Sequence, residues 1–443
     1  MPGYDAAVIS RFDLRSSDAD AHVLVDLPQG ESVAIAQSVS EVLALVRQQG
    51  DAALRELTER FDGVNIDEFR VPVPEVSAAL ASIDPELRTA LERAAARIRE
   101  YHEQQGAVPT AVGIDRDGVS VTEVVVPVDR VGCYVPGGLA VYPSSVLMTV
   151  IPARVAGVPE VVLCVPPGSD GRVPTVTLAA AAIAGVDEIY RVGGSQAIAA
   201  MAYGTESIAA VDVIVGPGNA YVSAAKRAVA GAGIVGIESP AGPSELVVVA
   251  DADAPADWIA GDLVAQAEHG PGGRAILVTW DAALADAVDR ALSKQVENAS
   301  RMSEIASTLE TGGLSLLVRD EEQAMAVVNQ LAPEHLELVV NDPETLVGKV
   351  RNAGAVFLGA QTPTALGDYV AGANHVLPTG RSARFASALR VDNFRKHIHI
   401  VRATEGGVRE LGAVGAVIAR AEGLDAHALS LEMRSVGRPE RKA

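Results

Sequence analysis

Cysteine is scarce in this chain of 443 residues, which contains only Cys133 and Cys164. Two cysteines cannot form a disulfide framework or a zinc finger, so we expect a reducing compartment, namely the cytoplasm. Basic side chains are also few, with 36 Lys and Arg against 57 Asp and Glu and a formal net charge of −21. Because nucleic acids and anionic membranes attract clustered positive charge, neither is expected as a partner.

Long apolar runs are absent as well. The longest stretches, such as residues 146–151 and 178–183, are far shorter than the ~20 residues that span a bilayer. The N-terminus does not combine a basic start with a following apolar stretch, so no signal peptide is expected. The length exceeds the ~250–300 residues at which one hydrophobic core usually divides, which predicts two or more domains. These features together predict a soluble cytosolic enzyme.

Strand-like segments alternate with helix-like ones, which predicts an α/β fold. Apolar residues at helical spacing predict helices at residues 33–47, 51–61, 84–103, 143–156, 175–184, 197–203, 220–230, 256–268, 282–297, 407–421 and 425–436. Apolar and β-branched runs predict strands at residues 119–128, 160–165, 188–192, 211–215, 246–250, 274–278, 313–319, 336–340 and 355–358.

Two glycine-rich turns, Gly193-Gly194 and Gly216-Pro217-Gly218-Asn219, follow predicted strands and open predicted helices. This repeated arrangement is typical of an open parallel sheet, in which ligands bind at the carboxyl ends of the strands. Taken alone, each turn is more often structural than functional. A literal G-x-G-x-x-G motif at residues 231–236 is rejected, because its glycines end a helix instead of opening one.

The sequence Pro333-Glu334-His335 places a carboxylate and an imidazole side by side, just before a predicted strand. An unperturbed histidine has a pKa of ~6.5, so such a pair can remove protons from an alcohol or a bound water near neutral pH. Glu334 and His335 are therefore the candidate acid/base residues.

A second group of residues is suited to a metal. Gln266 and His269 are three apart at the end of a predicted helix and share one face of it, and the following Gly270-Pro271-Gly272-Gly273 ends that helix. Carboxamide oxygen, imidazole nitrogen and the Asp368 carboxylate suit a divalent ion such as Zn²⁺, and His427 could complete the set. A lone histidine in such a place is more often a helix-terminal residue. The presence of several such residues in glycine-flanked settings favours the metal.

Other polar residues allow two interpretations. His375 in Gly372-Ala373-Asn374-His375 could line a pocket or stabilise a turn, and Ser244 could be an ordinary turn residue after Pro243. Neither cysteine is expected to act as a nucleophile, because Cys164 lies in an apolar strand and Cys133 in a glycine-rich turn.

Several strings of residues resemble the histidinol dehydrogenase family, in the same order and over nearly the whole chain. They are Tyr134-Val135-Pro136-Gly137-Gly138, Val192-Gly193-Gly194 with Gln196-Ala197, Gly216-Pro217-Gly218-Asn219, Ala241-Gly242-Pro243-Ser244-Glu245, Gln266-Ala267-Glu268-His269-Gly270, Ala332-Pro333-Glu334-His335-Leu336, Gly367-Asp368-Tyr369, Gly372-Ala373-Asn374-His375-Val376-Leu377-Pro378-Thr379, and Glu422-Gly423-Leu424 with Ala426-His427.

The resemblance implies a fold and a division of the chain. The fold class is α/β, with two incomplete Rossmann-like parallel-sheet domains and helical N-terminal and C-terminal extensions. The expected parts are an N-terminal extension (1–27), a first α/β domain with the metal and acid/base residues (28–132 and 245–380), a second α/β domain on the NAD side (133–244), and a C-terminal helical extension (381–443).

The resemblance also implies an activity, the oxidation of L-histidinol to L-histidine through bound L-histidinal, with two hydride transfers to NAD⁺. It implies one Zn²⁺ per subunit, held by Gln266, His269, Asp368 and His427, and acid/base catalysis by Glu334 and His335. Substrate contacts are implied for Ser244, His335, His375 and Glu422 together with the metal ligands. An NAD⁺ site is implied to be lined by Tyr134, Gln196 and Asn219. The family is a homodimer, so Glu422 and His427 are expected to complete the site of the partner subunit.

Two other classes of function share part of this pattern. A zinc hydrolase would use the metal and Glu334 but would not need the glycine-rich strand ends. A non-catalytic zinc protein would keep the metal ligands but should tolerate the loss of His335. NADH formation from histidinol separates both classes from a dehydrogenase.

Overall fold

The structure, a computed structural model, describes residues 8–16, 33–106, 113–137, 140–239, 242–270 and 272–435. Its contacts divide the chain into two units: Met1–Gln105 with Asp129–Phe394, and Gly106–Val128 with Arg395–Ala443. Within the described residues, no helix is both long enough and apolar enough to cross a membrane.

The first unit contains a six-stranded parallel sheet with the order β1-β11-β10-β9-β12-β13. Its strands are β1 (Ser10–Asp13), β9 (Glu245–Ala250), β10 (Arg274–Thr279), β11 (Gly313–Leu317), β12 (His335–Val339) and β13 (Ala355–Leu358). Successive residues of β9 enter different cores: Leu246 and Val248 pack on one face, Val247 and Val249 on the other. Both faces are therefore covered, as is usual for a parallel sheet.

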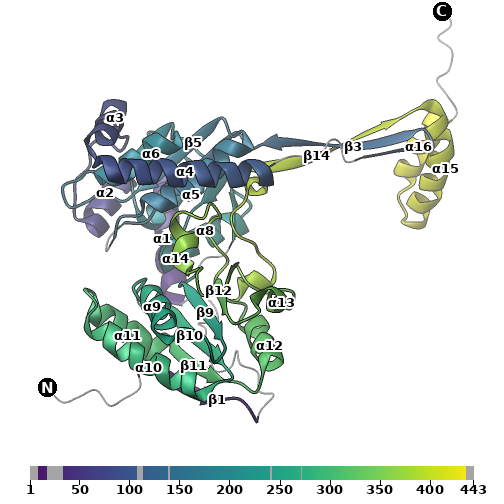
Figure 1. Cartoon of the computed structure of the whole chain (residues 1–443). Coiled ribbons are helices and arrows are strands. Elements are labelled where there is room, and N and C mark those ends of the chain that lie inside the picture. Colours follow the sequence, from purple (N-terminus) through teal and green to yellow (C-terminus); the bar gives the residue numbers. More distant parts are fainter. Residues whose placement is uncertain are drawn as a thin grey trace, which may run out of the picture. The chain divides into compact units, whose positions relative to one another are not determined.

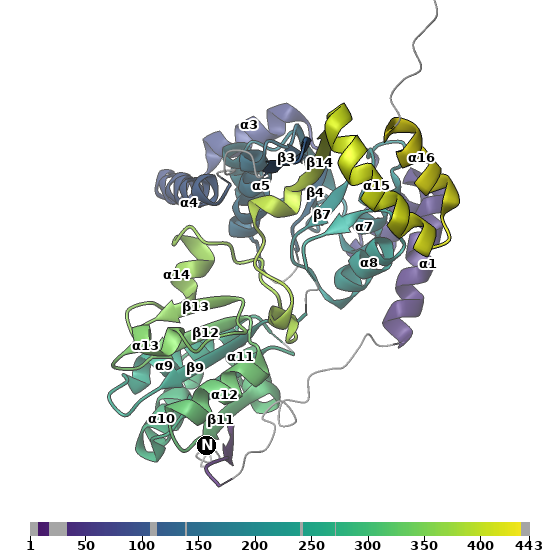
Figure 2. The ribbon, with the colours of Figure 1, turned by 90° about the vertical axis from the view of Figure 1, so that its right-hand side faces the viewer.

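Helices cover this sheet on both sides (Figure 2). The helices α9 (Ala256–Ala267), α10 (Ala282–Glu297) and α11 (Met302–Gly312) supply one core, and α12 (Glu321–Leu331) and α13 (Pro343–Val347) supply the other. A short helix, α14 (Thr364–Tyr369), follows β13.

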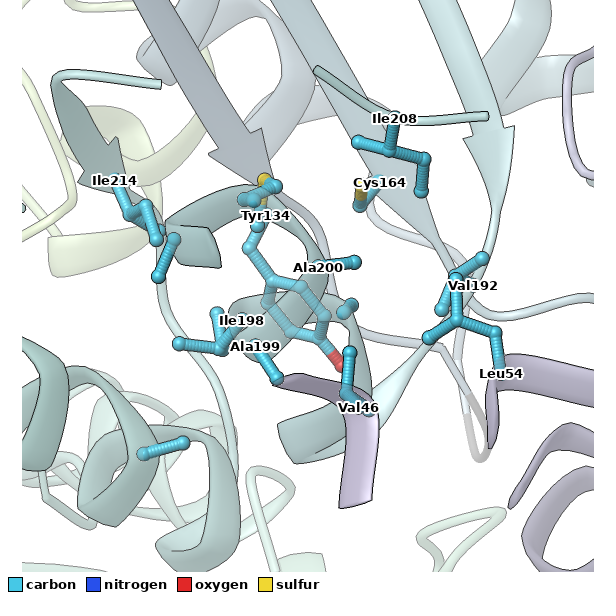
Figure 3. Close-up of a cluster of buried hydrophobic side chains, with 14 of the residues drawn as sticks. Val46, Leu54, Tyr134, Cys164, Val192, Ile198, Ala199, Ala200, Ile208 and Ile214 are labelled. Carbon is cyan, nitrogen blue, oxygen red and sulfur yellow. The ribbon is translucent and has the colours of Figure 1, made fainter. Parts of the chain in front are cut away.

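A second parallel sheet in the same unit has five strands in the order β6-β5-β4-β7-β8. Its strands are β4 (Arg130–Tyr134), β5 (Glu160–Val165), β6 (Glu188–Arg191), β7 (Val213–Val215) and β8 (Gly236–Ile237). The helices α7 (Gly194–Tyr203) and α8 (Ala220–Gly231) share a core with α1 (Val33–Gln49) and α2 (Asp51–Asp62), part of which is shown in Figure 3. The helix α3 (Val73–Ser82) packs on α6 (Thr175–Ala184), and α4 (Pro85–Gln105) packs on α5 (Pro143–Ala156).

The expected α/β class with parallel sheets is confirmed, but the grouping of the N-terminal helices differs from the expected division. Residues 28–132 were expected with 245–380, whereas α1 and α2 bury Val42, Val46 and Leu54 in the core of the five-stranded sheet. The sequence shows that α1 has an apolar face but not which sheet that face covers, so the grouping could not be read from it.

The expected N-terminal extension is only partly described, because residues 1–7 and 17–27 lie outside the described residues. Its described part forms the edge strand β1, parallel to β11. Arg11 on β1 contacts Asp286 (2.6 Å) and Asp289 (2.5 Å) on α10. These ion pairs hold the edge strand against that helix.

The second unit is an antiparallel sheet followed by two helices that lie side by side (Figure 1). The sheet has the order β14-β3-β2, from β2 (Gly113–Arg116), β3 (Val119–Pro127) and β14 (Arg395–Ala403), and the helices are α15 (Glu405–Ala421) and α16 (Asp425–Ser435). Both predicted C-terminal helices are confirmed, although Val436 lies outside the described residues. The strand β14 was not predicted.

Candidate active site

Most candidate residues of the first unit line one cavity of about 390 Å³. The cavity receives Asn219 from the five-stranded sheet side and Ser244, His269, Glu334, His335, Asp368 and His375 from the six-stranded sheet side. Gly138, Ala241 and Pro271 of the quoted motifs lie outside the described residues.

The two sheets contribute opposite ends of their strands to this cavity. Gly137 follows β4 and Asn219 follows β7, at carboxyl ends as the sequence predicted. Ser244 immediately precedes β9, and Glu334 and His335 stand at the start of β12, so these residues lie at amino ends. The glycine-rich turn of the five-stranded sheet thus lies at carboxyl ends of strands, where the sequence predicted ligands to bind, whereas the six-stranded sheet contributes residues from amino ends.

The backbone before β12 turns sharply. The helix α12 ends at Leu331, and the residue after it, Ala332, has a φ of 48°, which is left-handed and uncommon for a residue with a side chain. Pro333 follows and cannot continue a helix. This turn brings the buried Glu334 and His335 against Glu245 at the start of β9.

Glu334 and His335 are held by the backbone of the neighbouring strand. The Glu245 amide donates to Glu334 Oε2 over 3.0 Å, and His335 Nδ1 donates to the Glu245 carbonyl oxygen over 3.2 Å. The same Glu334 oxygen lies 3.5 Å from His335 Nδ1. Because Nδ1 must carry a proton to reach a carbonyl, Nε2 is the nitrogen of His335 that can exchange protons.

The charges around His335 shift two pKa values. Burial lowers the pKa of His335, but the negative charges of Glu334 and Asp368 outweigh burial and raise it to about 9. Burial, reinforced by the Glu334 charge, raises the pKa of Glu245 to about 7. His335 Nε2 lies 3.5 Å from Asp368 Oδ1 and has no hydrogen-bond partner among the described residues.

The residues proposed to hold a metal lie beside this pair. His269 Nδ1 donates to the Gln266 carbonyl over 3.2 Å, which leaves its Nε2 lone pair for a ligand. Ser244 Oγ donates to Gln266 Oε1 over 3.4 Å, while the buried Gln266 Nε2 has no partner among the described residues. Burial acts to raise the pKa of Asp368, but the nearby positive charge of His335 outweighs burial and lowers it.

Gln266, His269 and Asp368 line a second cavity, which shares His269 and Asp368 with the first. An anionic carboxylate, an imidazole lone pair and a carboxamide around that cavity form a donor set that fits Zn²⁺. Within the described residues, no cluster of three or more His, Cys, Asp or Glu is assembled as a metal site. Glu422 and His427 belong to the second unit, where both are exposed at the junction of α15 and α16.

His375 forms part of the cavity wall and is held at both nitrogens. Its Nδ1 donates to the Asp368 carbonyl over 2.9 Å, and its Nε2 lies 3.2 Å from Ser145 Oγ. Burial lowers the pKa of His375, so the ring is neutral at neutral pH and accepts from the Ser145 hydroxyl. Ser145 was not predicted from the sequence, because nothing in its apolar helical setting marks it as functional.

Of the three residues expected at an NAD⁺ site, only Asn219 lines the cavity. Asn219 Oδ1 caps α8 by accepting from the amides of Tyr221 (3.0 Å) and Val222 (3.1 Å). The Tyr134 ring is buried in the core near Ile198 and Ala199 (Figure 3), and its hydroxyl accepts from the Gly194 amide over 3.0 Å. Gln196 is 1% exposed in the first turn of α7.

Both cysteines are fully buried, which agrees with the expectation that neither is a nucleophile. Burial raises the pKa of the Cys133 thiol to about 12 and also raises that of Cys164. A thiolate, the reactive form, is therefore strongly disfavoured at both positions.

Two parallel sheets, a carboxylate–imidazole couple and a glycine-rich turn around one small cavity define an α/β enzyme with an acid/base site. The family model for histidinol dehydrogenase matches residues 27–435. A histidinol dehydrogenase from Aromatoleum aromaticum is 48% identical over 434 residues, covering 97% of this chain and 98% of the relative. One from Rhodospirillum rubrum is 52% identical over 403 residues, covering 89% of this chain and 91% of the relative.

The crystal structure of histidinol dehydrogenase from Elizabethkingia anophelis superposes with a TM-score of 0.92 at 34% identity, covering 97% of this chain and 99% of that one. The chain belongs to the histidinol dehydrogenase family. It is therefore an oxidoreductase of histidine biosynthesis.

Proposed function

We propose that the chain oxidises L-histidinol to L-histidine in the cytoplasm, in two steps through bound L-histidinal, with NAD⁺ and one Zn²⁺ per subunit. The observation that carries this proposal is a pair of cavities that share His269 and Asp368: Glu334 and His335 line one, and Gln266 lines the other. Family membership supports the dehydrogenase activity, and the geometry of these residues supports the cofactors.

The donor atoms fit zinc. The Nε2 lone pair of His269, the anionic Asp368 and the Gln266 side chain would hold the ion, together with His427. When bound, Zn²⁺ would supply a Lewis-acid anchor for the imidazole and amine nitrogens of histidinol. Ser244, His335, His375 and Glu422 would contact the substrate around that anchor.

The glycine turns of the five-stranded sheet fit a dinucleotide that must approach the backbone closely. A Cβ at Gly218 would lie 2.4 Å from Val222 Cγ1, so a side chain there would crowd the turn beside Asn219. Tyr134 and Gln196 would support the NAD⁺ site from the buried core. The Tyr134 hydroxyl, for example, binds the Gly194 amide. NAD⁺ bound there would accept the hydride of each oxidation.

His335 and Glu334 divide the proton chemistry. Loss of hydride from the carbinol carbon requires that a base remove the hydroxyl proton, and His335 Nε2 is placed for that role beside the cavity. Against the effect of burial, the negative charges of Glu334 and Asp368 hold the pKa of His335 at about 9, and a cation held by Asp368 would lower that pKa so that Nε2 can accept the proton. The second oxidation acts on the hydrate of the aldehyde, which forms when water adds to the carbonyl carbon. The Glu334 carboxylate, adjacent to His335, would activate that water. Backbone bonds from Glu245 hold both side chains in place before substrate arrives.

We also propose a homodimer in which the second unit completes the site of the partner subunit with Glu422 and His427. Among the described residues, the hydrophobic core of the helical part of this unit consists of Ala416, Ala419 and Ala428, with Leu431 partly buried. Large apolar side chains stay exposed on β14 and on α15, namely Ile398, Ile400, Val401, Leu411, Val414, Val417 and Ile418. A small core beside a large apolar surface is typical of a segment that packs against another chain.

The proposal is tested with purified protein, histidinol and NAD⁺. We expect NADH formation at two equivalents per histidinol consumed, and one zinc per subunit by elemental analysis. A chelator that removes the zinc should abolish turnover, and added Zn²⁺ should restore it. Undiminished turnover by verified metal-free protein would refute the zinc assignment, and the absence of NADH would refute the cofactor.

A further inference from the structure

A buried ion pair lies next to the cavity and has no part in the chemistry described so far. Lys226 on α8 and Glu238 after β8 have side chains that are 3% and 2% exposed. Lys226 Nζ donates to Glu238 Oε1 over 2.6 Å and to Oε2 over 2.7 Å.

Both members of this pair bind the same glycine. The Gly216 amide donates to Glu238 Oε1 over 2.8 Å, and Lys226 Nζ donates to the Gly216 carbonyl over 3.0 Å. Gly216 has a φ of 119°, and a Cβ there would lie 2.0 Å from the Tyr134 carbonyl oxygen. The peptide groups on either side of this strained position are therefore fixed by charged hydrogen bonds.

The fixed glycine begins the turn Gly216-Pro217-Gly218-Asn219, of which Pro217, Gly218 and Asn219 line the cavity. A buried ion pair is rarely more stable than apolar residues of the same volume, because its desolvation cost offsets its attraction. The Lys226–Glu238 pair instead contributes here by the conformation that it imposes on the turn. It also neutralises Glu238, a cavity-lining carboxylate that would repel an anionic cofactor.

We propose that Lys226 and Glu238 are positioning residues that hold the turn of residues 216–219 in the conformation that binds NAD⁺. They set the affinity for the dinucleotide and leave the affinity for histidinol unchanged, because the residues proposed to bind histidinol belong to the six-stranded sheet side or to the second unit and, among the described residues, none of them bonds to Lys226 or Glu238. The inference rests on the proposed use of NAD⁺.

The first variant is Lys226→Met, which removes all three hydrogen bonds from Nζ and leaves Glu238 as an unpaired buried charge. We expect its KM for NAD⁺ and its Kd for NAD⁺, measured by calorimetry on the zinc-loaded protein, to rise at least tenfold. The KM for histidinol should stay within twofold. Lys349→Met, which breaks an exposed ion pair with Glu322 on α12, is the control and should change none of these constants.

The second variant, Lys226→Met/Glu238→Leu, separates positioning from stability. Removal of both charges avoids the unpaired carboxylate, so the melting temperature should recover relative to Lys226→Met. The bonds to Gly216 remain lost, so the Kd for NAD⁺ should stay high. A double variant that binds NAD⁺ like the wild type would overturn the inference, as would equal rises in both KM values. Failure of the wild-type protein to bind NAD⁺ would instead overturn the proposed cofactor, and the inference with it.

Discussion

At the scale of single residues, the couple of Glu334 and His335 carries the proton chemistry, and the two members can be tested separately. The His335→Asn variant lacks the base, so we expect turnover of histidinol to fall by ~10²–10⁴-fold. The Glu334→Gln variant should slow the oxidation of added histidinal more than the first hydride transfer from histidinol. Single-turnover NADH formation from each substrate measures both steps, with zinc content as the control. Equal losses on both substrates in Glu334→Gln would show that Glu334 acts through His335 instead of on water.

Asp62, the last residue of α2, gives a prediction on pH and stability. Burial raises its pKa to about 6, and its Oδ2 has no hydrogen-bond partner among the described residues. The folded state therefore keeps the Asp62 proton to a higher pH than the unfolded chain does. The contribution of Asp62 to the free energy of unfolding is present in full below pH ~4 and is lost as the pH rises through about 6. We expect Asp62→Asn to raise the free energy of unfolding at pH 8 by about 1 kcal/mol, a value discounted for partial exposure, and by almost nothing at pH 4.

Urea unfolding of wild type and variant at both pH values measures this difference. Asp67→Asn, at an exposed position between α2 and α3, is the matched control and should not shift the midpoint. An equal gain for Asp62→Asn at both pH values would show that the carboxylate charge is not the cause.

At the scale of elements, the sequence predicted the buried parts best. Residues 143–156, 160–165, 175–184, 282–297 and 355–358 form helices and strands with the predicted bounds. Such segments have strong apolar periodicity or short β-branched runs that one local pattern explains. The candidate site residues of the first unit could be singled out, because an adjacent carboxylate and imidazole, or a glutamine and histidine three apart, are visible in the sequence itself.

The elements and contacts that were not predicted depend on residues far away in the sequence. The strand β14 is exposed along most of its length and owes its conformation to antiparallel pairing with β3, Arg395 opposite Pro127 and Ala403 opposite Val119. A sequence does not show such a pairing. Ser145 and the Lys226–Glu238 pair escaped for the same reason, since each gains its role from a residue on another element.

The loop that enters β13 supports the catalytic strand, which leads to a prediction for one glycine. A Cβ at Gly354 would lie 2.6 Å from the Glu334 carbonyl oxygen, and the Gly354 amide donates to the Pro333 carbonyl over 2.9 Å. The Gly354→Ala variant should push Glu334 away from Glu245 and lower turnover about tenfold or more, because small displacements of a catalytic group are costly. In Gly348→Ala the new methyl group would meet only Thr345 at 3.6 Å, so this variant should keep full turnover. Steady-state NADH formation compares the two, and equal activities would contradict the argument.

At the scale of the whole molecule, the two units differ in how much of their apolar side-chain surface they bury. The first unit buries the cores of two parallel sheets, whereas the second unit exposes large aliphatic side chains along α15 and β14. Formal charge is −21, so non-specific association between copies is opposed by repulsion. Association therefore has to be specific, and the apolar surface of the second unit is the region where it is expected. Under the proposed ligand set, in which His427 joins Gln266, His269 and Asp368, this association has a chemical consequence.

Mixed dimers test whether the second unit crosses to the partner. In a dimer of one His427→Ala subunit and one Gln266→Ala subunit, a crossing arrangement leaves one site with every ligand and one site with two losses. We expect such a dimer, isolated with two different affinity tags, to show roughly half the wild-type turnover and to bind one zinc, whereas each parental homodimer is inactive. If each site were built from a single chain, both sites of the mixed dimer would lack one ligand. Its activity would then be no higher than that of the parents, and the proposal that Glu422 and His427 complete the partner's site would be wrong.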